Sequence, residues 1–386
     1  MKQFTIVLDG IADRPQIKLN GKTPMEAAVT PCLDGLYKQS KPGVVMTIPS
    51  GLEVGSAVAN MSLMGYNPAE VYRGRAVIEA AGADITVHPD NLYIRCNLVT
   101  LEGSSFDNSI MQSYSAHDIE TEKARLLVDR LNNEVFRPPF KLINTDTFRN
   151  ILVMEGAAQM AQQLNFMPAH DMIGGAVSDF IKGEGIIQDF YDLMRKAYAV
   201  LSRNNETAAN GIWFWGASYA PSFDQQPEGR RVVLAETTLM RGIAALSGTD
   251  CITTEKDSDF AGFLNVKRKN AIEALKEYDY AYIHIQELDD LSHERLALEK
   301  TRAIECIDEY FIRPFFDNVK PPYSAVIVSD HYTFSDSGGH GAQPAPFMLI
   351  GHGAGNAQGR FTEQHCHDTG LCIKASELVA WQRGKK

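Results

Sequence analysis

Short apolar runs alternate with helical patterns along most of the chain. Four runs of four to six residues carry almost no charge, as expected of strands that are covered on both faces of a sheet. These runs are Phe4–Leu8, Gly211–Trp215, Tyr280–Ile285 and Ala325–Val328. Helical patterns lie between them, including residues 295–316, where apolar residues recur with helical spacing. The alternation predicts an α/β core with a mostly parallel sheet flanked by helices.

The stretch from about residue 85 to 172 has a different pattern. It holds a predicted strand at Leu92–Thr100, a predicted helix at Glu120–Asn133 and a second strand at Arg149–Met154. We therefore expect a smaller α+β domain at residues 85–172, inserted between the core segments 1–84 and 173–386.

The composition argues against some classes of binding partner. The formal net charge is −11 and basic residues are not clustered, which argues against nucleic acid and against an anionic membrane surface. Six cysteines form no CxxC pair, so free thiols in a reducing cytoplasm are expected. No apolar stretch approaches the roughly 20 residues of a membrane span, and residues 1–20 do not have the pattern of a signal peptide.

Acidic residues and histidines gather where the predicted strands end. The carboxyl ends of parallel strands meet at one edge of a sheet, so carboxylates placed there repel one another unless a cation lies between them. A mixed Asp/His set suits Mn²⁺ or Zn²⁺ better than Mg²⁺. Six such residues are enough for two metals about 4 Å apart. They are Asp9, Asp289, His293, Asp330, His331 and His340. Taken singly, an aspartate at a strand end is more often a helix cap or a turn former.

Ser56 opens a helical pattern after a loop marked by Pro49, Gly51 and Gly55. Its ordinary role there would be an N-cap. The alternative is a nucleophile, because a helix N-terminus beside a divalent metal favours the anionic form of a hydroxyl. Such a serine could accept a phosphoryl group and pass it on.

Arginines supply the bidentate donors that phosphate and carboxylate groups require. The candidates are Arg14, the pair Arg73 and Arg75 in "YRGR", and Arg95 in "RCN". Each could also be an ordinary solvated side chain.

The motifs together resemble those of the archaeal-type cofactor-independent phosphoglycerate mutases, a family of the alkaline phosphatase superfamily. They cover nearly the full length and include "LDGIADRP", "GSAVANMSLMGYNP", "YRGRAVIEA", "RCNLVT" and the Asp-His sets. The resemblance implies an alkaline-phosphatase-like core, an inserted domain that caps the substrate, and two metals, often manganese. By the resemblance, Ser56 is the phosphorylated nucleophile. Asp9, Ser56, Asp330 and His331 would hold one metal, and Asp289, His293 and His340 the other.

The chain also departs from that family at three places. Ala57 follows the serine where an acidic residue is usual, and Asp289-Asp-Leu-Ser-His replaces a "DEAGHDG"-like stretch. "SYSAHDIETEKA", residues 113–124, stands where mutases carry an arginine-rich segment. That segment is similar to the related branch proposed to act as homoserine kinases. His117 and Asp118 within it could bind substrate, or could merely start the following helix.

The sequence therefore favours a metal-dependent cytoplasmic phosphotransferase that interconverts 2- and 3-phosphoglycerate, a glycolytic reaction, through a phosphoserine. A homoserine kinase-like transfer is the alternative, and a phosphatase or phosphodiesterase comes third, because the fold alone does not determine the reaction. A metal-binding protein without catalysis is the fourth possibility considered. The expected partner is a small phosphorylated metabolite.

Overall fold

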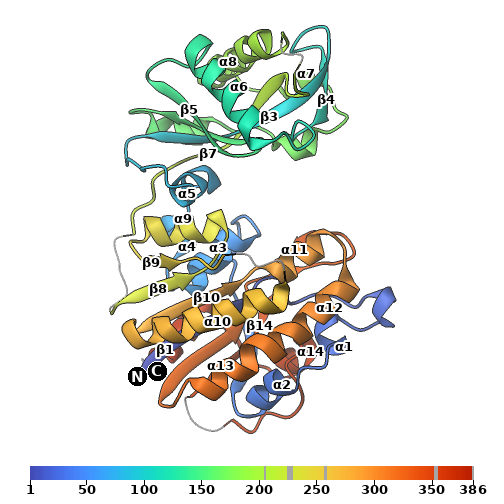
Figure 1. Ribbon diagram of the computed structural model, residues 1–386, viewed down its shortest axis with the longest axis vertical. Coiled ribbons are helices and arrows are strands. Elements are labelled where there is room, and N and C mark those ends of the chain that lie inside the picture. Colours follow the sequence, from blue (N-terminus) through green and yellow to red (C-terminus); the bar gives the residue numbers. More distant parts are fainter. Residues whose placement is uncertain (204–205, 224–228, 256–258, 352–354, 385–386) are drawn as a thin grey trace. The chain divides into compact units, whose positions relative to one another are not determined.

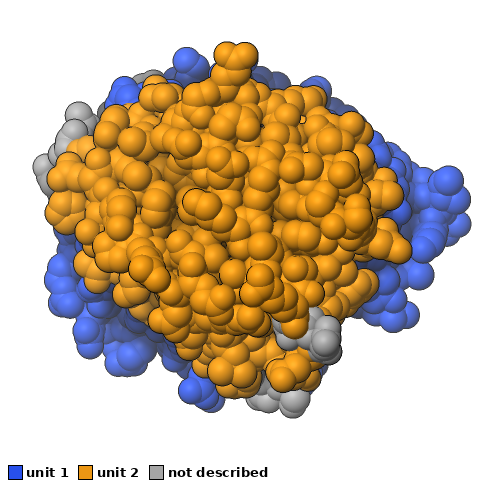
Figure 2. Space-filling model, turned by 90° about the horizontal axis from the view of Figure 1, so that it is seen from above, with its two compact units in different colours: residues 1–72, 223–386 blue, residues 73–222 orange. Residues whose placement is uncertain are grey.

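The computed structural model describes residues 1–203, 206–223, 229–255, 259–351 and 355–384. The chain divides into two compact units, which Figure 2 draws in different colours. Unit 1 consists of residues 1–72 and 223–386, and unit 2 consists of residues 73–222. Unit 2 thus extends beyond the expected inserted domain, residues 85–172, at both ends. Within the described ranges, none of the helices is long and apolar enough to cross a membrane.

Unit 1 is built on an eight-stranded sheet in the order β15-β2-β14-β11-β1-β10-β8-β9. Only β14 runs against the others, so the predicted mostly parallel α/β core is confirmed. The strands are β1 (Lys2–Leu8), β2 (Lys41–Met46), β8 (Arg231–Leu234), β9 (Asp250–Ile252), β10 (Tyr280–Ile285), β11 (Tyr323–Val328), β14 (Ala345–Ile350) and β15 (Cys372–Lys374). A separate two-stranded ribbon pairs β12 (Tyr332–Thr333) with β13 (His340–Gly341).

Helices cover both faces of this sheet (Figure 1). Phe4 of β1 packs in one apolar core with Leu264 and Phe315, and its ring centroid lies 5.2 Å from that of Phe315. On the opposite face, the hydroxyl of Thr5 lies 3.3 Å from Gln382 Oε1 of the last helix. The main helices of unit 1 are α2 (Pro31–Lys38), α3 (Ser56–Leu63), α9 (Thr238–Leu246), α10 (Phe260–Glu277), α11 (Glu287–His293), α12 (Ala297–Cys306), α13 (Arg313–Asn318), α14 (Glu363–Asp368) and α15 (Ala375–Gln382).

The expected helix at residues 295–316 is present as two α-helical parts, α12 and α13. A π-helical stretch, Ile307–Ile312, joins them without a break. Shorter elements of unit 1 are a 3-10 turn at Ile17–Leu19, α1 (Pro24–Ala27) and α4 (Pro68–Val71).

Unit 2 is an α+β unit with an antiparallel sheet in the order β4-β3-β6-β5, in which β7 pairs with the other side of β3. Its strands are β3 (Leu92–Gly103), β4 (Ser109–Ser113), β5 (Phe140–Asp146), β6 (Arg149–Met154) and β7 (Gly211–Tyr219). Its helices are α5 (Arg75–Gly82), α6 (Thr121–Glu134), α7 (Val177–Phe180) and α8 (Ile186–Leu201), with 3-10 helices at Ala158–Gln163 and Ala169–Met172.

One predicted core strand belongs to this second unit. The run Gly211–Trp215 lies in β7, where it pairs antiparallel with β3 instead of joining the parallel sheet. Trp213 and Phe214 are fully buried there. A strand buried on both faces has the same apolar pattern in either kind of sheet, so the pattern could not assign this strand to a domain.

Candidate active site

The register of the central strands brings three aspartates to one edge of the sheet in unit 1. Leu8 pairs with Ile285 of β10, and Val7 pairs with Val328 of β11, so β1, β10 and β11 end side by side. Asp9, Asp289 and Asp330 follow these ends, and all three are buried.

Gly10 permits the close approach of the segments that carry these aspartates. Its φ is +61°, a conformation that glycine adopts without strain. A Cβ at this position would lie 3.0 Å from Asp289 Oδ1 and would also collide with Thr333. The Gly10 N–H donates to Asp330 Oδ1 at 3.1 Å. The dipeptide Asp9-Gly10 therefore places one carboxylate and orients another.

The first group of possible metal ligands is Asp9, His284 and Asp330. Their ligand atoms all lie within 4.8 Å of one another, and His284 Nε2 is 3.1 Å from Asp9 Oδ2. Asn60 of α3 orients the third member, because its Nδ2 donates to Asp330 Oδ2 at 2.9 Å. Asn60 is in turn held by the Tyr282 hydroxyl, which donates to its Oδ1 at 2.6 Å.

The second group is Asp289, His331 and His340, again with ligand atoms within 4.8 Å. Asp289 Oδ1 lies 3.4 Å from His340 Nε2, and Asp289 Oδ2 lies 3.2 Å from His293 Nε2. His293 lies four residues after Asp289 on α11. Its Nδ1 donates a hydrogen bond to the Gly338 carbonyl, because a carbonyl oxygen can only accept. His331 also lies near the first group, since its Nε2 is 3.5 Å from Asp9 Oδ1.

Ser56 is the first residue of α3, and Gly55 occupies the N-cap position. The Ser56 side chain makes no capping bond, so the interpretation of Ser56 as the N-cap of this helix is wrong. Its hydroxyl lies instead 3.0 Å from His331 Nε2. The hydroxyl therefore lies at the positive end of a helix and beside the two histidine–carboxylate groups.

Burial and the neighbouring charged groups shift the pKa values of these residues. Burial, with the neighbouring Asp330 and Asp289 carboxylates, raises the pKa of Asp9 well above its usual value. Burial also acts to raise the pKa of Asp289, but hydrogen bonds from His293 and His340 outweigh it and lower that pKa. Burial lowers the pKa of His284 to about 4 and also lowers the pKa of His331, so both imidazoles are neutral near pH 7.

These residues fit divalent cations. Both carboxylate oxygens of Asp9 and both ring nitrogens of His284 are buried, and none of the four atoms makes a hydrogen bond among the described residues, although Asp9 Oδ2 and His284 Nε2 lie 3.1 Å apart. Leaving such groups unpaired is costly, whereas a cation would be ligated by the same lone pairs. Neutral imidazoles and carboxylates are the donors that Mn²⁺ and Zn²⁺ take.

The structure brings together all seven residues that the sequence suggested for metal binding and nucleophilic attack. They are Asp9, Ser56, Asp289, His293, Asp330, His331 and His340. Sequence reasoning missed His284, Asn60 and Thr333. His284 had a detectable signal, because it is a histidine within the apolar run Tyr280–Ile285 and only five residues before Asp289.

The candidate substrate-binding arginines fall into two places. Arg14 lies in unit 1, where its Nε donates to Asp336 Oδ2 at 2.7 Å. In unit 2, Glu79 joins two others: its carboxylate lies 3.3 Å from Arg75 Nη2 and 2.9 Å from Arg95 Nε.

Aromatic rings lie beside two of the candidate arginines of unit 2. The guanidinium of Arg95 lies 3.5 Å from the centre of the Trp215 ring, and that of Arg73 lies 5.9 Å from the centre of the Tyr219 ring. Arg73, Arg75 and Arg95 therefore share one neighbourhood, which we call the arginine cluster.

His117 and Asp118 lie in a left-handed turn ahead of α6. Ala116, His117 and Asp118 have φ values of 50°, 55° and 57°, which is unusual for three successive residues other than glycine. The turn is held by the His117 N–H, which donates to Ser113 Oγ at 2.9 Å. Because α6 begins only at Thr121, these two residues do not start the helix.

Comparisons with known proteins identify the family of the chain. The model of the 2,3-bisphosphoglycerate-independent phosphoglycerate mutase family matches residues 38–205. A protein of that name from Methanosarcina barkeri is 31% identical, with 98% of each chain covered. A second one, from Methanothermobacter thermautotrophicus, is 31% identical, with 99% of this chain and 95% of the relative covered.

Solved structures show the same fold. A protein from Pyrococcus horikoshii superposes with a TM-score of 0.81 at 24% identity, covering 99% of this chain and 96% of the other. A cofactor-independent phosphoglycerate mutase from Thermoplasma acidophilum superposes with a TM-score of 0.64 at 20% identity, covering 99% and 98%. The full-length similarity to the two curated relatives confirms the family that the motifs suggested. This chain belongs to the 2,3-bisphosphoglycerate-independent phosphoglycerate mutase family and is a phosphotransferase of the phosphoglycerate mutase type.

Proposed function

We propose that the protein interconverts 2- and 3-phosphoglycerate through a phosphoryl group carried on Ser56. The observation that carries this proposal is the position of the Ser56 hydroxyl, 3.0 Å from His331 Nε2 at the N-terminus of α3. A hydroxyl that neither caps its helix nor bonds to a carbonyl, and that faces a cluster of acids and histidines, is arranged as a nucleophile.

Two divalent ions, Mn²⁺ or Zn²⁺, would be held by the strand-end residues. Asp9, His284 and Asp330 form one donor set, and Asp289, His293 and His340 form the other, with His331 within reach of both. When bound, such ions stabilise the negative charge of a phosphoryl group in transfer. The surplus of carboxylates at this edge supports cation binding, because three buried aspartates would otherwise repel one another.

The proposed reaction has two steps: transfer of the phosphoryl group to Ser56, and its transfer back to glycerate. Ser56 Oγ would form a bond to phosphorus as the bond from phosphorus to the 3-oxygen of glycerate breaks. The 2-oxygen of the same glycerate would then attack the phosphoserine and free Ser56. The N-terminal N–H groups of α3 would favour the negative charge that develops at this point.

The arginine cluster of unit 2 has donors that suit an anionic ligand. A guanidinium offers paired donors to a carboxylate or a phosphate, and Glu79 and the aromatic rings restrict the freedom of the side chains. Arg14 lies in unit 1, where its Nε and Nη2 both donate to Asp336.

A homoserine kinase-like transfer is the second candidate, and one observation favours it. The strained turn at Ala116–Asp118 lies in a segment, residues 113–124, that contains no arginine. Strained backbone often marks a ligand-binding segment. Homoserine presents an ammonium as well as a carboxylate, so an acid such as Asp118 would suit it.

A comparison of acceptors tests these proposals. Purified protein with Mn²⁺ is incubated with 3-phosphoglycerate alone, with homoserine and ATP, and with a generic phosphate ester. The proposal predicts 2-phosphoglycerate in the first mixture with no nucleotide present. Phosphohomoserine in the second mixture together with inert phosphoglycerate would instead establish the kinase. Release of inorganic phosphate from all esters would indicate a phosphatase, the third alternative.

A further inference from the structure

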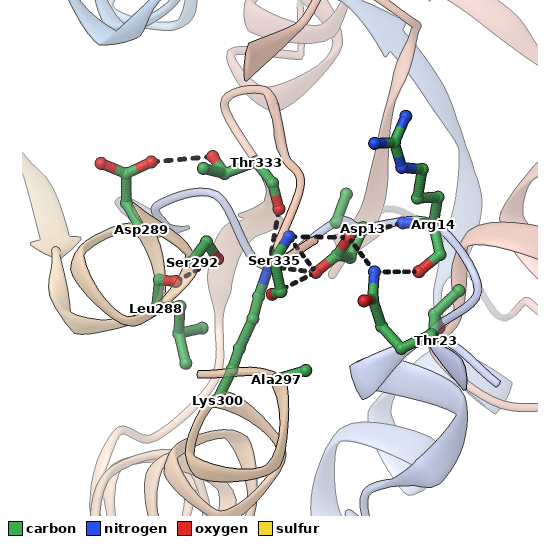
Figure 3. Close-up of polar contacts among 12 residues, drawn as sticks. Asp13, Arg14, Thr23, Leu288, Asp289, Ser292, Ala297, Lys300, Thr333 and Ser335 are labelled. Atoms are coloured by element: carbon green, nitrogen blue, oxygen red, sulfur yellow. Dashed lines mark hydrogen bonds and ion pairs between the residues drawn. The ribbon is translucent and has the colours of Figure 1, made fainter. Parts of the chain in front are cut away.

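The hydroxyl of Thr333 lies between two of the candidate metal ligands. Thr333 Oγ1 is 2.7 Å from Asp289 Oδ1 and 3.1 Å from His331 Nδ1. Figure 3 shows the threonine side chain directed at the Asp289 carboxylate. Thr333 is fully buried, so water does not compete for these two bonds.

The backbone of Thr333 is held on both sides. Its N–H donates to the Ala12 carbonyl at 3.0 Å, and its carbonyl accepts from Lys300 Nζ at 3.1 Å (Figure 3). Lys300 also lies 3.2 Å from Asp13 Oδ2, and both side chains are fully buried. Asp13 accepts a further bond, 2.6 Å long, from the hydroxyl of Ser335. A buried ion pair whose members are satisfied in this way is costly to break, so it restricts movement of the segment that carries Thr333.

The chemistry of the three partners determines which atom donates. The carboxylate of Asp289 only accepts, so the Thr333 hydroxyl donates its single proton to Asp289. Towards His331 the same oxygen can then only accept, and Nδ1 of His331 must carry a proton. In a neutral imidazole the lone pair is consequently on Nε2. Nε2 is the atom that lies 3.0 Å from Ser56 Oγ and 3.4 Å from Asp330 Oδ2.

We propose that Thr333 is a positioning residue that sets the tautomer of His331 and the orientation of the Asp289 carboxylate. Both groups would then have lone pairs free to bind a divalent ion. The metal-binding part of this inference rests on the proposed function, whereas the tautomer follows from hydrogen bonds within the protein alone. Loss of a hydrogen bond that orients a metal ligand typically weakens metal binding by about 10–100-fold.

Metal affinity of three variants tests the proposal. Chelator-treated protein is titrated with Mn²⁺ in a calorimeter. Thr333→Val removes the hydroxyl at nearly constant shape and should weaken Mn²⁺ binding by about 10–100-fold. Thr333→Ser keeps the hydroxyl and should bind nearly as the original protein does. Thr301→Val is the matched control, because the Thr301 hydroxyl bonds only within α12, to the Ala297 carbonyl at 2.9 Å. It should leave affinity unchanged.

A second measurement needs no variant at position 333 and no metal. The ¹⁵N chemical shifts of the histidine rings report the tautomer, and the spectrum of His331→Asn identifies the His331 signals. We predict a protonated Nδ1 in the metal-free protein. Protonation at Nε2, or a Thr333→Val variant with unchanged Mn²⁺ affinity, would overturn the inference. If phosphoglycerate is not converted but both predictions for Thr333 hold, the proposed function fails and this inference stands.

Discussion

His331 Nε2 and Ser56 Oγ lie 3.0 Å apart, although 275 positions separate the two residues in the chain. The contact exists because β11 ends at the same sheet edge that receives the N-terminus of α3. Asn60, one turn into α3, strengthens the link, since its Nδ2 bonds both the Ser56 carbonyl and Asp330 Oδ2 at 2.9 Å. The nucleophile proposed here and the ligand strand therefore form one hydrogen-bonded assembly.

Replacing Ser56 with alanine should abolish turnover and leave the fold intact. The hydroxyl makes no capping bond, so its loss should change the free energy of unfolding by no more than about 1 kcal/mol. The catalytic rate should fall by several orders of magnitude, because a covalent route is removed. Denaturant titration and a coupled assay for 2-phosphoglycerate measure the two effects. Activity close to that of the unchanged protein would show that Ser56 is not the nucleophile.

Replacing Gly10 with alanine should lower the free energy of unfolding by more than backbone strain alone would. The new Cβ would meet Thr333 and Asp289, and the φ of +61° is unfavourable for alanine. We expect the free energy of unfolding to fall by about 2–4 kcal/mol, from strain and overpacking together. Chemical denaturation checks this value.

Gly21→Ala is the matched control for that experiment. Gly21 also has a positive φ, +77°, but a Cβ there would have nothing within 4 Å. This variant should lose only the strain energy of about 1 kcal/mol. Equal losses in the two variants would contradict the close packing inferred around Gly10.

Metal removal should lower thermal stability, and His284 should contribute to the effect. A cation that binds only the folded state stabilises it by about 2.7 kcal/mol when its concentration is 100 times the dissociation constant. Mn²⁺ should thus raise the melting temperature of chelator-treated protein. His284→Asn should reduce that rise. His365→Asn is the control, because His365 bonds to Thr362 and belongs to neither ligand group. Identical Mn²⁺ responses of both variants would exclude His284 as a ligand.

Stability should depend on pH through Glu363, which lies outside both ligand groups. Burial raises its pKa to about 7, while its two oxygens accept from the Asp13 N–H and the Thr23 hydroxyl. In the unfolded chain the pKa returns to about 4.3. The folded state therefore holds a proton that the unfolded state releases, and stability falls as pH rises from about 4.3 to 7.

The variant Glu363→Gln isolates this effect. Between pH 5 and pH 8 the original protein should lose more stability than the variant, by on the order of 3 kcal/mol. Denaturant titrations at the two pH values give the difference. Parallel pH profiles would mean that Glu363 is ionised in the folded protein at both values.

Much of the parallel core could be predicted from the sequence, because the central runs of β1, β10 and β11 are mostly apolar and carry almost no charge. Once their direction is known, the aspartates that follow them must share an edge. His284 was missed because a single histidine inside an apolar run is usually a buried polar residue with a partner. Here it faces Asp9, which only the pairing of β10 with β1 reveals.

Other features depend on contacts that sequence spacing does not encode. Thr333 follows His331 by two residues, yet its role depends on Asp289, which is brought to it by a different strand and helix. Gly211–Trp215 has the composition of a core strand, but its partner is β3. The strained turn at Ala116–Asp118 contains no glycine that would have marked its positive φ values.

Trapping the phosphoryl group on the protein tests the role of Ser56 as nucleophile. Protein with Mn²⁺ is mixed with 3-phosphoglycerate, quenched in acid within milliseconds, and analysed by intact mass and peptide mapping. We predict one added phosphoryl group, located on Ser56, which disappears in Ser56→Ala. Formation of 2-phosphoglycerate with no phosphoryl group on Ser56 at any quench time, or with the group on another residue, would contradict it.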